Sequence, residues 1–291
     1  MAVWKDPLTP RIVIPSDLEC QWFQLGSKKF QLLSHQYEML AAKEELVIAM
    51  GGYGCAKTDA GVKKIAHLAM WPNNRIIVGR NSHTDLVDTT QRDLMDFLYE
   101  AQLVKVPPNS KVKTCIVHCV DPRTQQNLGY TSEINFQHLD NPEHLRGRHI
   151  GAYWIDEASE VKLKAHLNLQ GRLRLPAFAG KYQALITGNP QGRNWCFDLG
   201  FNEELIMAAR CKNPKHSHSD PLDSNLCVRR KRRAIHARSI DNYFLPPDYI
   251  DNMLSSYNAM QVKRYMDGEF DVFEGAVFGE FDNDMHILRA A

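Results

Sequence analysis

The segment from Leu46 to Ala66 carries the feature that most constrains this chain. Residues 51–58 read Gly-Gly-Tyr-Gly-Cys-Ala-Lys-Thr, between an apolar run that predicts a buried strand and a stretch that predicts a helix. A strand, a glycine-rich turn, Lys-Thr and a helix form the layout of a phosphate-binding loop. Its glycines let backbone N–H groups curl around phosphate oxygens, and the helix N-terminus turns partial positive charge toward them. The alternative, a glycine-rich segment that is only a turn, stays open at this point.

Each position of this loop has an expected role. Phosphates are expected to be surrounded by the backbone of Gly51, Gly52, Tyr53, Gly54, Cys55 and Ala56. Lys57 should reach the β- and γ-phosphates and so take part in catalysis, and the Thr58 hydroxyl should ligate Mg²⁺. Ala56 stands where the usual pattern has a glycine before the lysine. These roles predict ATP and Mg²⁺ as ligands.

A second signal follows roughly a hundred residues later. The apolar run 150–155 predicts a strand, and it ends in Asp156 and Glu157. Asp156 is expected to hold the Mg²⁺ shell, and Glu157 is expected to act as the general base toward water. Two solvated acids at the end of an ordinary strand are the alternative. Together with the glycine-rich loop, the acidic pair favours nucleotide hydrolysis.

Three further positions are candidates for contact with the nucleotide. Gln36, ahead of the first core strand, could read the adenine edge or lie on a helix surface. Thr187-Gly188-Asn189-Pro190 could sense the γ-phosphate, although the tetrapeptide would form a plain turn in any case. Arg146 is the preferred arginine for stabilising transition-state charge, ahead of Arg80 and Arg148.

Composition limits the class of protein. The chain has 291 residues, is 44% hydrophobic and carries a net charge of +1, which predicts one large globular domain with a smaller appendage and no global attraction for polyanions. No apolar stretch approaches the length of a membrane span, so no membrane partner is expected. The seven scattered cysteines are expected to be reduced thiols in a cytosol.

Two clusters of charged or metal-ligating residues need separate interpretation. The basic run 229–233 could contact nucleic-acid phosphates, or it could be solvated. Cys115, His118 and Cys119 lie in an alternating strand pattern with no second cysteine pair at zinc spacing, so metal binding is not expected there. His216 and His218 lie in a Ser/Pro/Lys loop and are expected to face solvent.

The order of elements predicts an α/β fold with a mostly parallel sheet flanked by helices. Strands are expected at 46–50, 75–79, 114–120, 132–138, 150–155 and 182–187, the third and fourth forming an antiparallel pair, and helices at 35–45, 84–103, 159–172 and 246–267. The acidic strand makes this an additional-strand P-loop NTPase core. The expected division is an N-terminal arm at 1–30, the core at 31–210, a lid or linker subdomain at 211–270, and a further segment at 271–291.

The motifs together resemble the large terminase subunit of tailed bacteriophages, in its ATPase half, from about residue 31 onward. The resemblance rests on Gly51–Thr58, Val78-Gly79-Arg80-Asn81, Leu145-Arg146-Gly147, Trp154-Ile155-Asp156-Glu157-Ala158 and Thr187-Gly188-Asn189-Pro190. The family loop reads Gly-Gly-Arg-Gly-Ser-Gly-Lys-Ser, so Tyr53 replaces its arginine and Ala56 its last glycine. In this context Asn189 is expected to couple phosphate release to a moving element.

The resemblance implies a function and partners. It implies Mg²⁺-dependent ATP hydrolysis that drives double-stranded viral DNA into a procapsid in the host cell cytoplasm. The implied partners are double-stranded DNA, the portal protein, the small terminase subunit and further copies in a ring, with a monomer as the isolated form. Residues 271–291 resemble the start of the family's nuclease domain, but Asp282 and Asp284 alone cannot form a two-metal site, so nuclease activity is not expected.

Two other functions stay open on the sequence. A helicase-like ATPase would share the core, although it would need a second phosphate-loop domain. A non-catalytic scaffold would explain Tyr53 and Ala56 as marks of a decayed site. The intact set of Lys57, Thr58, Asp156 and Glu157 argues against decay.

Overall fold

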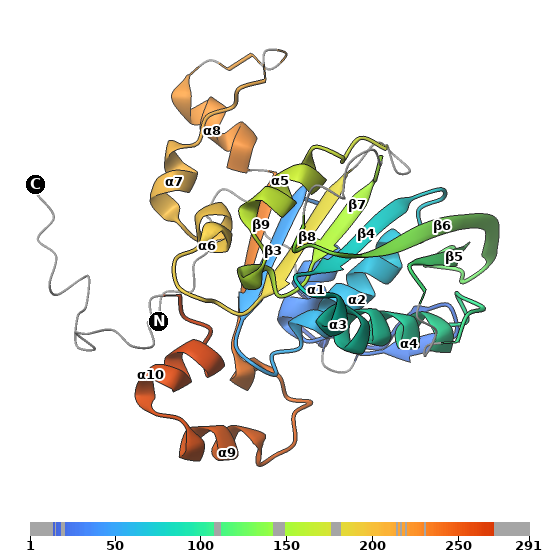
Figure 1. Cartoon of the computed structure of the whole chain (residues 1–291), viewed down its shortest axis with the longest axis horizontal. Coiled ribbons are helices and arrows are strands. Elements are labelled where there is room, and N and C mark those ends of the chain that lie inside the picture. The colour runs from blue at the N-terminus through green and yellow to red at the C-terminus, as the bar shows by residue number, and fades with distance from the viewer. Residues whose placement is uncertain are drawn as a thin grey trace, which may run out of the picture.

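A single mixed sheet organises the computed structural model, which describes residues 14, 16–18, 21–107, 112–141, 149–175, 182–213, 215, 217–218, 220–229 and 231–270 (Figure 1). The strands are β1 (Phe23–Leu25), β2 (Lys28–Phe30), β3 (Leu46–Gly51), β4 (Arg75–Arg80), β5 (Thr114–Val120), β6 (Asn127–His138), β7 (Ala152–Ile155), β8 (Gln183–Gly188) and β9 (Arg232–Ala237). Within the described residues, seven of them pair in the order β5-β6-β4-β7-β8-β3-β9. Within this seven-stranded sheet of the described residues, only β5 runs antiparallel to its neighbour, as the sequence predicted.

The order of the central strands decides the class of the fold. β8 lies between β3, which leads into the glycine-rich loop, and β7, which leads into the acidic pair. A strand inserted between these two is the defining feature of the additional-strand core that the sequence predicted. Because β3, β7 and β8 are parallel, their carboxyl ends meet at one edge of the sheet, where ligands bind in open α/β folds.

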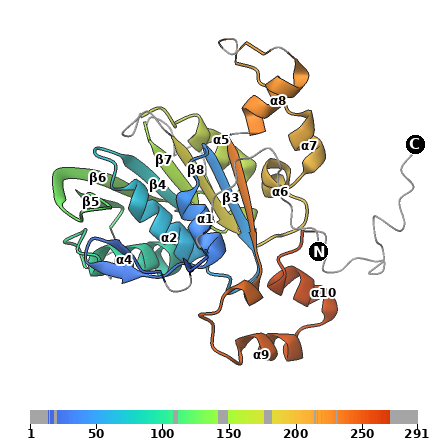
Figure 2. The ribbon, with the colours of Figure 1, turned by 180° about the vertical axis from the view of Figure 1, so that it is seen from behind.

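Helices cover both faces of the sheet (Figures 1 and 2). They are α1 (Ser34–Ala41), α2 (Lys57–Leu68), α3 (His83–Asp85), α4 (Arg92–Glu100), α5 (Leu163–Gln170), α6 (Trp195–Gly200), α7 (Glu203–Ala208), α8 (Pro221–Arg229), α9 (Tyr249–Ser256) and α10 (Ala259–Gln261). Val47 and Ala49 of β3 pack with α1, α2 and α4, whereas Ile48 and Met50 pack with α5 and α6. Burial on both faces explains why β3 and β8 read as continuous apolar runs.

Several expected elements differ from those observed. Residues 23–30 form the hairpin β1–β2 rather than an irregular arm. The helix expected at 84–103 is interrupted by a π-helical turn at Leu86–Gln91, and the one expected at 246–267 is broken into α9, α10 and a π-helical turn at Val262–Met266. The strand β9 pairs with β3 in the main sheet although it lies in the segment expected as a lid. The division into arm, core and lid stays a prediction.

The basic run and the histidine loop also differ from expectation. Arg233 in β9 is nearly buried and forms ion pairs with Glu44 at 2.7 Å and Glu38 at 3.5 Å. Lys231 pairs with Glu45 at 2.9 Å. These two cations stabilise the sheet edge, so neither phosphate contact nor a free solvated face describes Arg233. His218, expected to face solvent, is half-buried beside two cysteines.

No helix among the described residues is long and apolar enough to cross a lipid bilayer. Arg146, Arg148, His216 and the segment 271–291, about which the sequence makes predictions, lie outside the described residues.

Helices α7 and α8 extend from one end of the sheet, and α9 and α10 lie at the other end, beside the glycine-rich loop (Figures 1 and 2).

Gly61 lets α2 approach β7 closely. A Cβ atom there would lie 2.3 Å from Cζ2 of Trp154, a fully buried side chain. We therefore predict that Gly61→Ala destabilises the fold by about 1–2 kcal/mol, because overpacking outweighs the better helix propensity of alanine. Gly171→Ala is the matched control, since its Cβ would meet nothing closer than 3.6 Å. Urea unfolding followed by tryptophan fluorescence checks both, and equal stability of the two variants would contradict the packing argument.

Candidate active site

The glycine-rich loop connects Gly51 at the end of β3 to Lys57 at the start of α2. Two of its residues adopt left-handed backbone, Gly54 with φ 71° and Ala56 with φ 63°. Glycine adopts this conformation freely, whereas alanine pays for its Cβ. The replacement of glycine by Ala56 therefore preserves the loop conformation and stores strain directly ahead of the helix N-terminus.

The segment after β9 packs directly on this loop. Ser239 Oγ donates to Tyr53 O and Asn242 Nδ2 donates to Gly54 O, both at 2.6 Å. The ring of Tyr53 stacks on Tyr265 with centroids 4.9 Å apart and planes within 8° of parallel. The residue that replaces the family's arginine thus joins the loop to the expected lid.

Two loop N–H groups serve this packing. Gly52 N donates to Ala237 O at 3.0 Å, and Tyr53 N donates to Tyr265 O at 2.6 Å. In this conformation Gly52 and Tyr53 do not offer these N–H groups to a phosphate, contrary to their expected role. Phosphate contact therefore stays a prediction for the N–H groups of Gly54 and of the residues that lead into α2.

Lys57 and Thr58 open α2 and face the acidic pair. Lys57 is nearly buried, and its Nζ donates to Gly52 O of the same loop at 3.2 Å. Thr58 Oγ1 lies 3.5 Å from Asp156 Oδ1, a long hydrogen bond between α2 and the end of β7. The ammonium, the hydroxyl and the carboxylate expected to share one site are therefore brought together.

Asp156 is almost completely buried, with 1% of its surface exposed, and it accepts strong hydrogen bonds. Thr90 Oγ1 donates to Oδ2 and Thr187 Oγ1 donates to Oδ1, each at 2.7 Å. Trp154 Nε1 in turn donates to Thr187 Oγ1 at 2.7 Å. A buried carboxylate is tolerable only with such donors, which fix the direction of its lone pairs.

Glu157 follows in left-handed backbone, with φ 48° and ψ 48°. For a non-glycine residue this conformation is strained and is common at functional positions. Burial raises the pKa of Glu157; nearby Lys57 opposes the rise, Asp156 adds to it and Arg80 opposes it. Its Oε2 lies 3.4 Å from the backbone N–H of Asn189. A strained carboxylate with a raised pKa beside a cation has the properties of a general base.

Asn189 lies within contact of this carboxylate. Its carbonyl accepts a hydrogen bond from Ser159 Oγ at 2.5 Å. Its side-chain Oδ1 is buried and accepts no hydrogen bond from the described residues. The backbone of Asn189 is thus held next to Glu157, while its side chain keeps an unused acceptor.

The side-chain amide of Gln36 is hydrogen-bonded to the end of the glycine-rich loop. Its Nε2 donates to Ala56 O at 3.0 Å and to Asp59 Oδ2 at 2.7 Å, and its Oε1 accepts from Leu33 N at 3.0 Å. Both donors of the amide are engaged inside the chain. The structure shows Gln36 positioning the loop, and contact with adenine stays a prediction.

Arg80 is a described arginine whose charge acts on Glu157. It ends β4, beside β7, and its guanidinium opposes the rise in the pKa of Glu157. Its Nη1 is hydrogen-bonded to Thr89, while its buried Nε has no partner among the described residues. The preferred candidate, Arg146, lies outside the described residues.

Sequence reasoning did not identify Thr90. It lies in a π-helical turn within a segment that showed only helical periodicity, and β6, β4 and β7 bring that turn to Asp156. A hydroxyl pair, Thr89-Thr90, inside an apolar helix pattern was the available signal. It becomes informative only once the strand order is known.

The chain was compared with known families and structures. The profile of the family described as phage terminase large subunit matches residues 43–269. That match covers most of the chain and includes every described element of the site except Gln36. The chain belongs to the phage terminase large subunit family.

Individual relatives agree with this assignment. The PBSX phage terminase large subunit of Bacillus subtilis (strain 168) is 27% identical over 237 residues, which are 80% of this chain and 51% of the relative. The large terminase of the thermophilic bacteriophage D6E superimposes with a TM-score of 0.65 at 14% identity, covering 89% of this chain and 58% of that chain. The chain thus spans about half the length of these terminases.

A further similar structure is that of an isolated large terminase ATPase domain. The ATPase domain of the Thermus phage P74-26 large terminase superimposes with a TM-score of 0.55 at 15% identity. The alignment covers 83% of this chain and 94% of that domain. At this identity the likeness shows the fold alone, and the described terminase chain therefore has the fold of a large terminase ATPase domain.

The strain at Ala56 gives a testable consequence. We predict that Ala56→Gly stabilises the terminase chain by about 0.5–1 kcal/mol, because relief of left-handed strain exceeds the greater entropy of glycine in the unfolded chain. Ala60→Gly is the matched control, since Ala60 is buried within α2, where glycine costs about 1 kcal/mol. Chemical denaturation measures both free energies of unfolding. Destabilisation by both substitutions would show that Ala56 is not strained.

Proposed function

We propose that this terminase chain hydrolyses ATP with Mg²⁺ and that the hydrolysis drives double-stranded viral DNA into a procapsid. The observation that carries the proposal is the meeting of Lys57 and Thr58 with Asp156 and Glu157 at the carboxyl edge of one parallel sheet. The D6E large terminase, of the same fold, has been solved with ADP and with ATP-γ-S. These complexes support nucleotide as the ligand of this edge.

Each residue of the site would have a separate role in ATP hydrolysis. N–H groups from Gly54 onward and the Lys57 ammonium would hold the phosphates, at the positive end of α2. Thr58 and Asp156 form a hard oxygen set that fits Mg²⁺, and a bound Mg²⁺ would neutralise charge on the β- and γ-phosphate oxygens. Glu157 would accept the proton of the attacking water on a side-chain oxygen.

Charge in the transition state also needs a cation. Arg146 remains our first candidate, acting within the chain or from a neighbouring subunit of a ring. Arg80 is the candidate among the described residues because its charge already acts on Glu157. Asn189, whose backbone N–H approaches Glu157, would report loss of the γ-phosphate to the rest of the motor.

The loop contacts support a coupling role for the segment expected as a lid. Tyr53 accepts a hydrogen bond from Ser239 and stacks on Tyr265, and Gly54 accepts a hydrogen bond from Asn242. A change in the loop on phosphate release would therefore act directly on these three residues. We extend the proposal to the partners that such a motor needs: double-stranded DNA, the portal protein, the small terminase subunit and further copies in a ring, within the host cytoplasm.

The catalytic base gives the decisive test. We predict that Glu157→Gln lowers the rate of ATP hydrolysis by about 10²-fold or more, because an amide cannot accept the proton, while ATP binding persists. Glu160→Gln, an exposed acid three residues later, should keep the full rate. Phosphate release and binding of a fluorescent ATP analogue are measured in parallel, at several protein concentrations.

The outcomes separate the competing functions. Loss of hydrolysis with retained binding supports the ATPase, and a rate that rises faster than linearly with concentration shows that a neighbouring subunit completes the site. Binding without hydrolysis in the wild-type chain would favour a scaffold. Arg80→Ala, Arg146→Ala and Asn189→Ala, assayed in the same way, assign the arginine and the sensor.

The raised pKa of Glu157 predicts a pH dependence. Protonation removes the base, so the single-turnover rate should fall on acidification, and the fall should begin above the ordinary range of a glutamate. A rate that stays constant down to the ordinary glutamate range would sink the assignment of Glu157 as base.

A further inference from the structure

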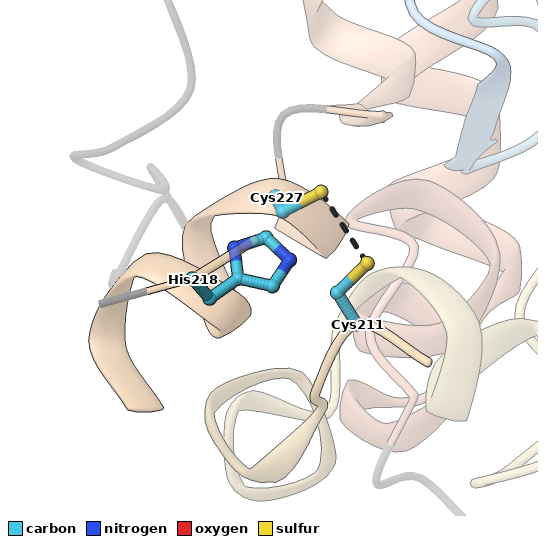
Figure 3. Close-up of side chains that lie close together, drawn as sticks. All are labelled: Cys211, His218 and Cys227. Carbon is cyan, nitrogen blue, oxygen red and sulfur yellow. Dashed lines mark hydrogen bonds between the residues drawn. The ribbon is translucent and has the colours of Figure 1, made fainter. Parts of the chain in front are cut away.

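Three metal-ligating side chains meet far from the nucleotide edge. Cys211 follows α7, Cys227 lies in α8, and His218 lies in the loop between these helices. One ligand atom from each lies within 4.8 Å of the others, and the two sulfurs are 3.5 Å apart. Figure 3 shows the three side chains pointing toward one another. They are separated by six and eight residues in the sequence, so folding has brought them together.

The backbone around the cluster is held in place by its own hydrogen bonds. Cys211 N donates to Ser224 Oγ at 2.8 Å. The buried Asn225 Nδ2 donates to the carbonyls of Ile206, Met207 and Ala209 at 2.8, 3.0 and 2.8 Å. The end of α7 is thereby fixed against α8, and the sulfur of Cys211 is presented to Cys227.

Apolar packing is scarce in this α7–α8 unit. Ile206 is buried, but Leu205, Met207 and Leu222 are 51%, 50% and 55% exposed. Units too small to bury a hydrophobic core are commonly stabilised by a metal ion or a disulfide. The cluster lies where such a cross-link would close the loop between the two helices.

The distances favour a metal ion over a disulfide. A disulfide needs sulfurs about 2.05 Å apart. Two thiolates on a tetrahedral Zn²⁺, each about 2.3 Å from the ion, lie roughly 3.8 Å apart, close to the observed 3.5 Å. A disulfide would also give the imidazole of His218 no part, whereas Zn²⁺ takes thiolate and imidazole together.

We propose that Cys211, His218 and Cys227 bind one Zn²⁺ that stabilises the α7–α8 unit, with a water molecule as the fourth ligand. The unit adjoins Arg232, which pairs with Leu46 at the amino end of β3, whereas the glycine-rich loop begins at the carboxyl end of that strand. The metal would therefore support structure and take no part in ATP chemistry.

The test measures zinc in the whole 291-residue chain, purified without a histidine tag under reducing conditions. We expect about one zinc ion per chain by elemental mass spectrometry. Cys211→Ser, Cys227→Ser and His218→Gln should each lower the zinc content at least tenfold and reduce the thermal unfolding midpoint. Cys119→Ala and His138→Gln, which alter a thiol on β5 and an exposed imidazole on β6, should keep the zinc of the wild type.

A second readout covers variants that fail to fold. Wild-type chain refolded with Co²⁺ alone should show thiolate-to-cobalt charge-transfer absorption and the visible bands of tetrahedral cobalt, both lost on addition of excess Zn²⁺. Absence of these bands overturns the proposal. A zinc content that is equal in all variants overturns it too. So does a Cys211–Cys227 disulfide that persists in metal-supplemented protein purified under reducing conditions, as detected by alkylation and peptide mass spectrometry.

Discussion

The carboxylate of Asp156 sets the arrangement around it. A charge buried at the end of β7 is costly unless donors surround it, and its donors come from separate elements: Thr58 on α2, Thr90 on a π-helical turn and Thr187 on β8. Trp154 adds an indole N–H to Thr187, and its ring also packs against Gly61. Satisfying one carboxylate therefore fixes the relative positions of two strands and two helical segments, and the chemistry of the edge depends on that geometry.

Strained backbone occurs on both sides of the same edge. Ala56 and Glu157 both occupy left-handed backbone, and each lies directly beside a residue that would hold Mg²⁺ or phosphate. Such strain persists only where the surroundings determine the conformation. For Ala56, Gln36 supplies a hydrogen bond from behind, and Ser239 and Asn242 bond the preceding part of the loop. The segment expected as a lid is therefore part of what holds the loop in shape.

The sequence predicted the parts of this site that depend on local pattern. The loop at 51–58, the acids after β7 and the β5–β6 pair follow from apolar runs and turn residues, and all are found in the fold. Strand β9 was missed because its first residues, Arg232 and Arg233, read as part of the basic run 229–233, when Arg233 in fact turns inward to Glu44. Thr90 and the cluster at His218 depend on long-range packing, which spacing along the chain does not reveal.

Strand β9 links the two ends of the molecule. It starts just after α8, runs parallel to β3 through six paired positions, and ends at Ala237, whose carbonyl accepts the N–H of Gly52. Because β9 is hydrogen-bonded along β3, it cannot slide without breaking the ladder on which the loop also depends. Strand β9 is thus held in fixed register with the strand that leads into the glycine-rich loop. We therefore expect the motion that follows phosphate release in the segment after Ala237, whose Ser239, Asn242 and Tyr265 contact the loop.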